Sequence, residues 1–497
     1  MEDNTAKIIG GSSFIFIIGI LSAIIALITR VVLARNLTLE EFGLFYAVFV
    51  FVSFFALFRN FGLGAALIKH VPEYRVKEKF DLVKSTVIVT GVWRIAISLV
   101  LAFVFFAFSD FLAVKYFHTL SASIILKLLS IFFFLSVFID MTRNLFEAFQ
   151  KPFWFPFVDF AKNAFVFVFV LLFLSFGFGI LSPVFAYIIM ALIVPLLFLP
   201  VLLRVFNFSK YKLIFSKRFG KKLFFFGLPF VFVSISAIVI SQVDTLLLTY
   251  FRSLGEVAVY NVVLPLSMIL LQFSSALAVI LFPMCSELWA KGEKENLVKI
   301  INSIYKYSYA IIIPLGLVVF AFTPLILESF FGREYVQGAL AMRILLMGVI
   351  LYTIANVNQY VLAGIGKPKI TAKIVGIVAL FNFSGNLILI PYYGIVGAAI
   401  MTTLSYALAL VLSLKYLHKY IELKIDYTSW VKMFFAGVLT VFMFYSLCSL
   451  FSFRLWVEFC LFGLVAIIFY VTLLLIFKII SFKELKLTLN LVKLFKD

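Results

Sequence analysis

The chain is poor in charged residues, cysteine and histidine, and each shortage excludes a class of protein. Charged residues make up 13% of the 497 residues, hydrophobic residues make up 64%, and the mean hydropathy is +1.17. Such a chain has too little polar surface to cover a soluble globule and belongs in a lipid bilayer. Its three cysteines, Cys285, Cys448 and Cys460, form neither a CxxC motif nor a disulfide framework, and its three histidines are scattered, so we expect no metal site.

Motifs for nucleotide hydrolysis and for hydrolytic catalysis are also absent from the sequence. The chain contains no GxxxxGK[ST], no HExxH and no GxSxG segment. It therefore cannot hydrolyse ATP by a P-loop mechanism, and we expect neither an enzyme nor a bound cofactor. Energy for transport would have to come from an ion gradient, a substrate gradient or a partner protein.

Long apolar stretches occupy most of the chain. Each runs for about 20 residues or more, which is enough for a helix to cross roughly 30 Å of hydrocarbon. We predict an all-α polytopic membrane protein with about fourteen transmembrane helices, at 12–34, 42–64, 83–108, 124–146, 157–176, 180–203, 223–250, 256–283, 305–327, 340–363, 372–392, 394–417, 431–451 and 455–478.

The sequence repeats itself at a distance of about 215 residues. Leu39 and Glu41 followed by FGLFYAV recur as Leu254 and Glu256 followed by VAVYNVV. The other matches are Leu82-Val83-Lys84 with Leu297-Val298-Lys299, Gly179-Ile180 with Gly394-Ile395, and Lys151-Pro152 with Lys367-Pro368. These matches fall at loops, where composition is not forced. Weak internal symmetry of this kind is typical of transporters built from two lobes.

Each repeat holds six predicted spans, so both repeats enter the membrane from the same side and are parallel. This predicts a six-helix lobe at 1–203, a basic cytoplasmic linker at 204–222 and a second six-helix lobe at 223–417. Two extra helices and a basic tail follow at 418–497. The extra helices either form a lipid-facing groove or serve only in packing.

Positive charge predicts the orientation of the bundle. Most of the 42 Lys and Arg residues fall in the termini and in alternate loops, and cytoplasmic loops are the basic ones. The loops predicted to be cytoplasmic are 65–82, 204–222, 284–304, 364–371 and 418–430. We therefore expect a multi-pass protein of the cell membrane with both termini in the cytoplasm. Anionic lipid accounts for much of the net charge of +19, so no nucleic-acid partner is required.

Three arginines lie inside spans of the first lobe, where a charge is costly and usually faces a cavity or a partner. They are Arg30 in span 1, Arg59 in span 2 and Arg94 in span 3. Guanidinium groups match phosphate oxygens in a bidentate manner, so the three could converge on one polyanion. The alternative is that each extends to the membrane interface or pairs with a carboxylate.

A denser charged group lies near the predicted inner ends of spans 4 and 5. It consists of Asp140, Arg143, Glu147, Asp159 and Lys162. Spacings of three and four residues place Asp140 beside Arg143, Arg143 beside Glu147, and Asp159 beside Lys162. Two interpretations remain: these residues form local ion pairs, or they form an inner gate whose ion pairs break when the cavity opens inward.

The second lobe contains one deep carboxylate, Asp244 in span 7. It could neutralise Arg30 across the cavity, or it could bind a coupling H+ or Na+. Span 10 carries Asn356, Asn358 and Gln359, which offer uncharged donors and acceptors suited to sugar hydroxyls. Hydrogen bonds between helices would explain these three side chains equally well.

A family resemblance is carried by TRVVLARNLTLEEFGLFYAVF at 29–49, FRNFGLGAALIKHVPEY at 58–74 and the two Lys-Pro turns. These segments resemble the polysaccharide biosynthesis branch of the multidrug/oligosaccharidyl-lipid/polysaccharide exporter superfamily, which includes flippases of the O-antigen and teichoic-acid type. The resemblance implies movement of a polyprenyl-linked oligosaccharide from the cytoplasmic to the outer leaflet. It also implies that Arg30 and Arg59 correspond to cavity arginines that engage a lipid-linked diphosphate.

The partners implied by this resemblance are a lipid-linked oligosaccharide, membrane lipids, H+ or Na+, and glycan-assembly proteins. Two other functions remain as alternatives. A multidrug antiporter of the same superfamily would typically show twelve spans and carboxylates in its cavity. A membrane oligosaccharide polymerase or ligase would need a large outer loop, whereas every predicted outer loop here is short.

Overall fold

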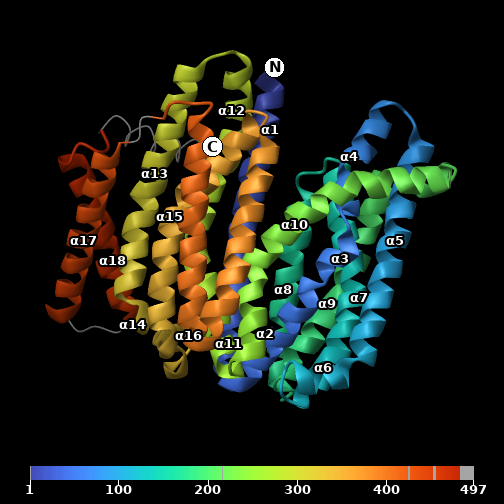
Figure 1. Ribbon diagram of the computed structural model, residues 1–497, viewed down its shortest axis with the longest axis horizontal. Coiled ribbons are helices and arrows are strands. Elements are labelled where there is room, and N and C mark those ends of the chain that lie inside the picture. The colour runs from blue at the N-terminus through green and yellow to red at the C-terminus, as the bar shows by residue number, and fades with distance from the viewer. Residues whose placement is uncertain (1, 215, 424–425, 451–454, 482–497) are drawn as a thin grey trace. The chain divides into compact units, whose positions relative to one another are not determined.

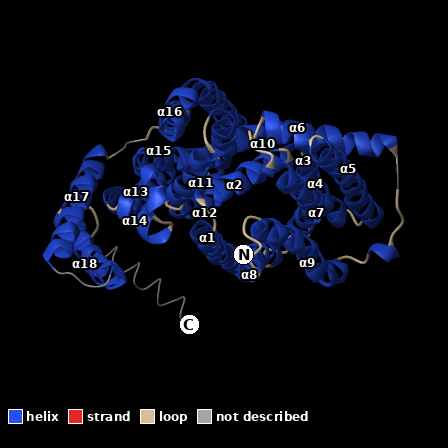
Figure 2. Cartoon of the chain, turned by 90° about the horizontal axis from the view of Figure 1, so that it is seen from below, coloured by secondary structure: helices blue, strands red, loops and turns tan. Residues whose placement is uncertain are grey.

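The computed structural model describes residues 2–214, 216–423, 426–450 and 455–481, and every regular element in these ranges is helical (Figure 2). The helices are α1 (Glu2–Asn36), α2 (Leu39–Phe54), α3 (Ala56–Asn60), α4 (Leu63–Val76), α5 (Phe80–Ala107), α6 (Ser109–Lys115), α7 (Ser121–Ala148), α8 (Trp154–Ser175), α9 (Leu181–Val205), η1 (Phe208–Lys210), α10 (Lys217–Phe251), α11 (Leu254–Met268), α12 (Leu271–Ala290), α13 (Lys294–Ala321), α14 (Thr323–Phe330), η2 (Arg333–Gly338), α15 (Ala339–Gly364), α16 (Pro368–His418), α17 (Tyr427–Leu450) and α18 (Leu455–Ile476).

Ten stretches of the described residues are long and apolar enough to cross a membrane as helices. The longest, Pro368–His418, is interrupted at Gly394, whose backbone is not helical. Two predicted spans lie on either side of this glycine. Three shorter apolar helices, Ile238–Phe251, Leu254–Met268 and Leu461–Ile476, overlap three further predicted spans. The helices therefore follow the predicted order of spans along the chain.

The sequence repeat marks the start of two corresponding helices. Thr38 precedes α2, and its hydroxyl accepts a hydrogen bond of 3.2 Å from the backbone N–H of Glu41. Ser253 precedes α11 and accepts a bond of 3.3 Å from the N–H of Glu256. A hydroxyl at this position satisfies one of the free donors of the first helical turn. The matching loop residues therefore encode the same helix start twice.

The repeat is also visible in the backbone, because residues with positive φ recur at the same spacing. Four such pairs lie 214, 214, 216 and 215 residues apart: Glu78 and Gly292, His118 and Gly332, Gln150 and Gly366, and Gly179 and Gly394. By contrast, the break at Phe61 (φ 33°) and Gly62 (φ 67°) has no counterpart with positive φ in the described part of the second repeat. The first repeat thus contains an extra break at this position, and Gly177 (φ 78°) is a further positive-φ residue of the first repeat without such a counterpart.

The chain divides into two compact units. Unit 1 consists of Met1–Leu266, Leu327–Ala341 and Val375–Ser405, and unit 2 consists of Ser267–Ile326, Met342–Ile374 and Tyr406–Asp497. The two units are defined by the packing of residues against one another, whereas the predicted lobes are defined by the sequence repeat. The lobe boundaries stay a prediction. Residues 482–497 of the predicted basic tail lie outside the described residues.

In unit 1, α10 runs obliquely across α2, α3, α4 and α5 (Figure 1). The backbones meet at two glycines, because a Cβ atom added at Gly227 would lie only 2.7 Å from the carbonyl carbon of Gly62. Gly62 also has a left-handed backbone that side chains disfavour. Ala66, Val89 and Leu223 are buried together and cover this crossing. The crossing therefore depends on the absence of side chains at both glycines.

The first turns of α2 and α11 also cross within unit 1. A Cβ atom added at Gly43 would collide with the carbonyl oxygen of Leu254, and one added at Gly255 would lie 3.3 Å from Cδ2 of Leu39. Both segments are buried. The two best-matched segments of the sequence repeat therefore pack directly against each other.

In unit 2, α13 packs against α17, and α17 packs against α18. The rings of Tyr309 and Trp430 meet edge to face with centroids 4.6 Å apart. A Cβ atom added at Gly437 would lie 2.6 Å from Cδ1 of Leu317, so the two helices also approach closely there. Of the two helices outside the repeat, α17 thus packs directly against α13, and α18 packs against α17.

Candidate functional site

The short helix α3 carries Arg59 into the interior of unit 1. Its chain is broken before the helix at Phe55 and after it at Phe61, whose backbone is left-handed. Arg59 is only 3% exposed. Its Nη1 donates hydrogen bonds of 2.7 Å to the carbonyl of Phe133 and to the hydroxyl of Ser136, and its guanidinium carbon lies 4.9 Å from the centroid of the Phe133 ring.

Arg94 of α5 shares a carboxylate with Arg59. Nη2 of Arg59 donates to Oδ2 of Asp140 on α7, and Nη2 of Arg94 lies 3.9 Å from the same oxygen. Arg94 also donates a hydrogen bond of 2.8 Å to Oδ1 of Asn60. Two buried cations therefore have one carboxylate between them, which leaves a net charge of +1 on these three side chains.

The two arginines are short of acceptors. Nε of Arg59 and both Nε and Nη1 of Arg94 are buried without a hydrogen-bond partner in the described structure. A guanidinium group has five N–H donors and no acceptor, and an unsatisfied buried donor is costly. We call Arg59, Arg94 and Asp140 the arginine cluster. Its geometry is suited to a further anionic acceptor.

One face of α7 continues from this cluster as a line of polar residues. Ser136, Asp140, Arg143 and Glu147 are spaced by four, three and four residues, which keeps them on the same side of the helix. Arg143 pairs with Glu147 at 3.0 Å, as the spacing predicts. It also pairs at 2.9 Å with Asp159 of α8, a contact between helices that spacing within one helix does not reveal.

The remaining predicted pairs divide into one that forms and one that does not. Lys162 lies 3.9 Å from Asp159, in agreement with their spacing. Asp140 pairs with Arg59 of a different helix instead of Arg143, three residues away. Of the five residues predicted as an inner gate, three thus lie on one face of α7 and two lie on the neighbouring helix α8. Asp140 belongs to the arginine cluster, and the other four form a chain of ion pairs.

Arg30 has a different partner from Arg59 and Arg94. Its Nε donates a hydrogen bond of 3.2 Å to the hydroxyl of Tyr46, and its guanidinium carbon lies 4.8 Å from the centroid of that ring. Tyr46 lies on α2, whereas Asp140, which both other arginines contact, lies on α7. The structure therefore brings together two of the three predicted arginines.

Asp244 of α10 is 1% exposed and is held by neutral donors. Its Oδ1 accepts a hydrogen bond of 2.5 Å from the amide of Asn386, and its Oδ2 accepts from the hydroxyls of Thr402, at 2.7 Å, and of Tyr260. Arg30 donates to Tyr46 and is not among the partners of Asp244 in the described structure. Asp244 is thus a buried carboxylate whose partners there carry no formal charge.

Further oxygen atoms surround this carboxylate. Asn386 donates at 3.0 Å to Oδ1 of Asn382, whose own amide lies 3.5 Å from the hydroxyl of Thr402. Oδ1 of Asn386 is buried without a partner in the described residues. We call Asp244, Tyr260, Asn382, Asn386 and Thr402 the aspartate cluster. Sequence reasoning missed four of these residues, although two asparagines one helical turn apart in an apolar span were a usable signal.

The polar residues predicted on span 10 lie in unit 2 and bond to neighbouring helices. Oδ1 of Asn358 accepts from the hydroxyl of Tyr305, and its amide donates at 2.9 Å to Ser413. The amide of Asn356 donates at 3.1 Å to Ser275. The backbone carbonyl of Gln359 accepts at 3.3 Å from Thr371. Bonds between helices therefore occupy the side chains of both asparagines.

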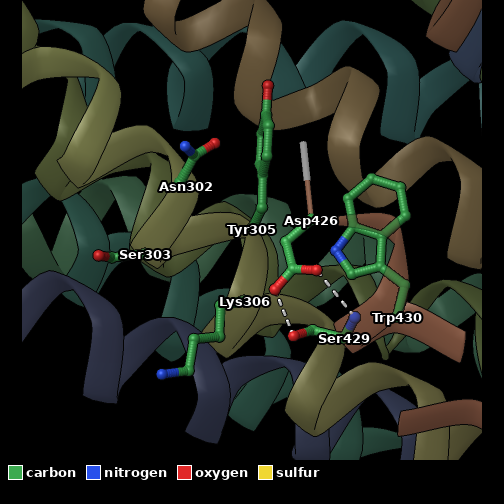
Figure 3. Close-up of a pocket in the computed structure, with 7 residues that line it drawn as sticks. All are labelled: Asn302, Ser303, Tyr305, Lys306, Asp426, Ser429 and Trp430. Carbon is green, nitrogen blue, oxygen red and sulfur yellow. Dashed lines mark hydrogen bonds between the residues drawn. The ribbon is translucent and has the colours of Figure 1, made fainter. Parts of the chain in front are cut away.

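A small polar cavity of about 180 Å³ lies between α13 and the start of α17 in unit 2 (Figure 3). Asp426 accepts hydrogen bonds there from the backbone N–H of Ser429, at 3.1 Å, and from its hydroxyl, at 2.5 Å. The hydroxyl bond and the backbone bond together hold the pKa of Asp426 below its ordinary value. The cavity is lined by Asn302, Ser303, Tyr305, Lys306, Asp426, Ser429 and Trp430.

The described residues contain no group of three or more His, Cys, Asp or Glu side chains that could hold a metal ion. Cys285 is a buried free thiol. The side chain of Cys460 lies outside the described part of the chain.

Comparison with solved structures shows the fold. The lipid II flippase MurJ in its inward closed conformation matches 93% of this chain and 98% of its own length, with a TM-score of 0.75 and 17% sequence identity. The predicted all-α polytopic membrane fold, which has fourteen spans in this fold class, is therefore confirmed.

Comparison with sequences shows the family. The profile of the family described as "Polysaccharide biosynthesis protein" matches residues 8–289, and the MatE profile matches residues 229–388. The uncharacterized membrane protein MJ1068 of Methanocaldococcus jannaschii is 30% identical over 450 residues, which cover 88% of this chain and 89% of that protein. The probable low-salt glycan biosynthesis flippase Agl15 of Haloferax volcanii is 28% identical over 229 residues, which cover 45% of this chain and 48% of that protein. The resemblance predicted from the sequence is confirmed: the chain belongs to the polysaccharide biosynthesis protein family of membrane transporters, within the superfamily that also contains the MATE proteins.

Proposed function

We propose that this transporter is a flippase that moves a polyprenyl-diphosphate-linked oligosaccharide from the cytoplasmic to the outer leaflet for the synthesis of surface polysaccharide or glycoconjugate. The observation that carries the proposal is the arginine cluster, in which Arg59 and Arg94 share one carboxylate and retain three N–H-bearing nitrogens without a partner in the described part of the chain. A diphosphate supplies several charged acceptors for such a pair. The similarity to Agl15, described as a probable glycan biosynthesis flippase, supports the same substrate class.

In this proposal the substrate moves by alternating access. Arg59 and Arg94 bind the diphosphate, and Arg30 contacts it at another stage of the passage. The ion pairs of Arg143 with Glu147 and Asp159 act as an inner gate, because the pair with Asp159 joins α7 to α8 and must rearrange if the two helices separate. Asn356, Asn358 and Gln359 would reach sugar hydroxyls only in a conformation that breaks their present bonds.

The aspartate cluster is the proposed coupling site. Asp244 is surrounded by hydroxyl and amide groups, and beside it lies Oδ1 of Asn386, which has no partner among the residues the structure describes. Carboxylate, amide and hydroxyl oxygens are suited to a proton or a small hard cation, here H+ or Na+. Because Asp244 and Tyr260 lie on α10 and α11 while Thr402 lies on α16, a bound ion would join three helices. Ion binding would then favour one conformation over another.

The proposed location is the cell membrane, with both termini in the cytoplasm. Two single-cysteine variants, in which the native cysteines are replaced, test this orientation. Glu78→Cys should be protected from a membrane-impermeant thiol reagent in intact cells, whereas Lys115→Cys should react with it. The opposite labelling pattern would overturn the orientation.

Cation-coupled multidrug antiport is the second candidate, and the MatE match over residues 229–388 favours it. The two functions differ in substrate charge. The arginine cluster favours an anionic substrate, whereas an antiporter for cationic drugs would need an excess of carboxylate in its cavity.

Depletion of the chain in its native cells separates these candidates. A flippase predicts that lipid-linked oligosaccharide accumulates on the cytoplasmic face and that surface glycan falls, with both defects reversed by re-expression. An antiporter predicts unchanged glycan and increased sensitivity to cationic drugs. Normal surface glycan and unchanged lipid-linked intermediates after depletion would exclude the flippase function.

A further inference from the structure

The three side chains of the arginine cluster differ in solvent exposure. The side chains of Arg59 and Arg94 are 3% and 1% exposed, whereas that of Asp140 is 37% exposed. The carboxylate therefore lies at the accessible edge of the cluster, and the guanidinium groups lie behind it. An anion that reaches the arginines must approach past Asp140.

The accessible edge of the cluster continues into a line of charged side chains. Asp140, Arg143 and Glu147 share one face of α7, and Asp159 of α8 is joined to that face through Arg143. Charged side chains in transmembrane segments almost always face a bundle interior or a water-filled cavity. This line of charged side chains indicates that the exposed edge of Asp140 faces an aqueous path and not hydrocarbon.

The way Asp140 is bound distinguishes it from a permanent structural partner. It satisfies only part of the donor capacity of the two arginines, because Nε of Arg59 and Nε and Nη1 of Arg94 have no acceptor among the described residues. A carboxylate also offers two oxygens, whereas a diphosphate offers several, so exchange of one for the other would satisfy more donors. The cluster is therefore balanced in charge only in part and incompletely hydrogen-bonded.

We infer that Asp140 is an internal counterion that occupies the phosphate position of the arginine pair and is displaced when the substrate anion binds. This inference rests on the proposed function only for the identity of the substrate, since the shared chemistry is that of any phosphate or diphosphate group. Asp140 lowers affinity by competing with the substrate, and it favours release by returning to Arg59 and Arg94. It acts as a regulator of the site and not as a substrate ligand.

The test is binding of inorganic pyrophosphate and, separately, inorganic phosphate to the purified full-length protein in nanodiscs, measured by titration calorimetry. Asp140→Asn should bind pyrophosphate about tenfold more tightly than the native protein, because a competing charge at hydrogen-bond distance has been removed. Asp110→Asn is the matched control, since it removes the same charge from a carboxylate that pairs with Lys127 of α7, outside the arginine cluster and the proposed gate. It should change affinity by less than about twofold, as expected for a screened and more distant charge.

A variant that fails to fold without its counterion still tests the inference. If Asp140→Asn is unstable because the arginines are left unpaired, pyrophosphate present during purification should restore a folded protein, while the same concentration of sodium chloride should not. Unchanged or weaker pyrophosphate binding by the folded variant, equal gains in both aspartate variants, or instability that pyrophosphate does not relieve would each overturn the role of Asp140.

The outcomes also separate this inference from the proposed function. Tighter pyrophosphate binding by Asp140→Asn in a protein that flips no lipid-linked glycan would retain the counterion and reject the flippase. Glycan flipping by the native protein with no effect of Asp140→Asn on pyrophosphate affinity would retain the flippase function and reject the counterion role of Asp140. Stronger binding of phosphate than of pyrophosphate would assign the pair to a monophosphate headgroup.

Discussion

The arginine cluster and the aspartate cluster lie in the same unit but balance charge in opposite ways. In the arginine cluster two cations face one carboxylate, and the surplus charge is positive. In the aspartate cluster a single carboxylate contacts hydroxyl and amide groups, and the surplus charge is negative unless Asp244 holds a proton or an ion. Burial makes both surpluses costly, so each cluster is suited to a ligand of opposite charge. We therefore propose anion recognition for the arginine cluster and cation coupling for the aspartate cluster.

The extra backbone break of the first repeat explains part of this difference. Phe61 and Gly62 have left-handed backbones, whereas the described residues at the corresponding position of the second repeat continue within α12. The break ends α3 directly after Arg59 and Asn60, and both residues bond to neighbouring helices there. Both repeats interrupt their second helix, at Phe55 and at 269–270, and the further break at Phe61 and Gly62 gives the first repeat a chemistry that the second does not share.

The largest expected effect comes from removing the arginine that contacts Asp140. Arg59→Ala should reduce transport of the lipid-linked glycan by about 100-fold or more, because truncation of one partner of a buried charge pair costs several kcal/mol. Arg59→Lys should restore only part of the activity, since it supplies charge without the planar fork. Flipping is measured in proteoliposomes at equal protein content. Full transport by the alanine variant would remove Arg59 from the site.

Neutralising the aspartate cluster should have a different and smaller effect. Asp244→Asn should lower gradient-driven transport by about tenfold, within the usual range of coupling between two sites. Binding of pyrophosphate to the purified variant should be unchanged, because the arginine cluster is intact. Transport that responds to the H+ or Na+ gradient as strongly in the variant as in the native protein would eliminate the coupling role and weaken the comparison.

The packing of the two repeats against each other should be the next most sensitive feature. Gly43→Ala should lower the free energy of unfolding by about 1–3 kcal/mol, because the added methyl group would collide with the backbone of Leu254 in a filled interface. Gly19→Ala in α1 is the control, since nothing lies within 4 Å of a Cβ atom at that position. Thermal unfolding in detergent compares the two variants. Equal melting temperatures would show that the crossing of α2 and α11 tolerates a side chain.

The smallest expected effect is a pH dependence at the crossing of α4 and α10. Burial lowers the pKa of His70, a bond to Glu73 raises it in part, and Lys222 and Lys69 lower it. The neutral form is therefore favoured on folding, so stability is fully present above pH 6.5 and falls as the pH drops through the lowered pKa. His70→Gln should lose this component of acid sensitivity. An identical change in melting temperature between pH 7.5 and 5.5 for the native protein and the His70→Gln variant would contradict this role of His70.

The sequence was sufficient to predict the helical spans and the repeat. Apolar length alone identifies a membrane helix, and the paired caps at Glu41 and Glu256 are local interactions of adjacent residues. The same locality explains why the ion pair of Arg143 with Glu147 was predictable. Features determined within one helical turn can be read from spacing.

The contacts that define the two clusters could not be read in this way. Asp140 is three residues from Arg143, yet it pairs with Arg59, which is 81 residues distant in sequence. Asp244 meets Asn386 and Thr402 over separations of 142 and 158 residues. Such pairings depend on how helices are rotated and where α3 is broken, and a single sequence does not encode these as a periodic pattern.

The most direct test of the account is a flipping assay in proteoliposomes that contain the native protein and a fluorescent polyprenyl-diphosphate-linked oligosaccharide. If the protein is a flippase, the native protein transfers the lipid between leaflets, and the Arg59→Ala/Arg94→Ala double variant reconstituted at the same density does not. Equal transfer by the two proteins, or no transfer by the native protein under an imposed H+ or Na+ gradient, would contradict it.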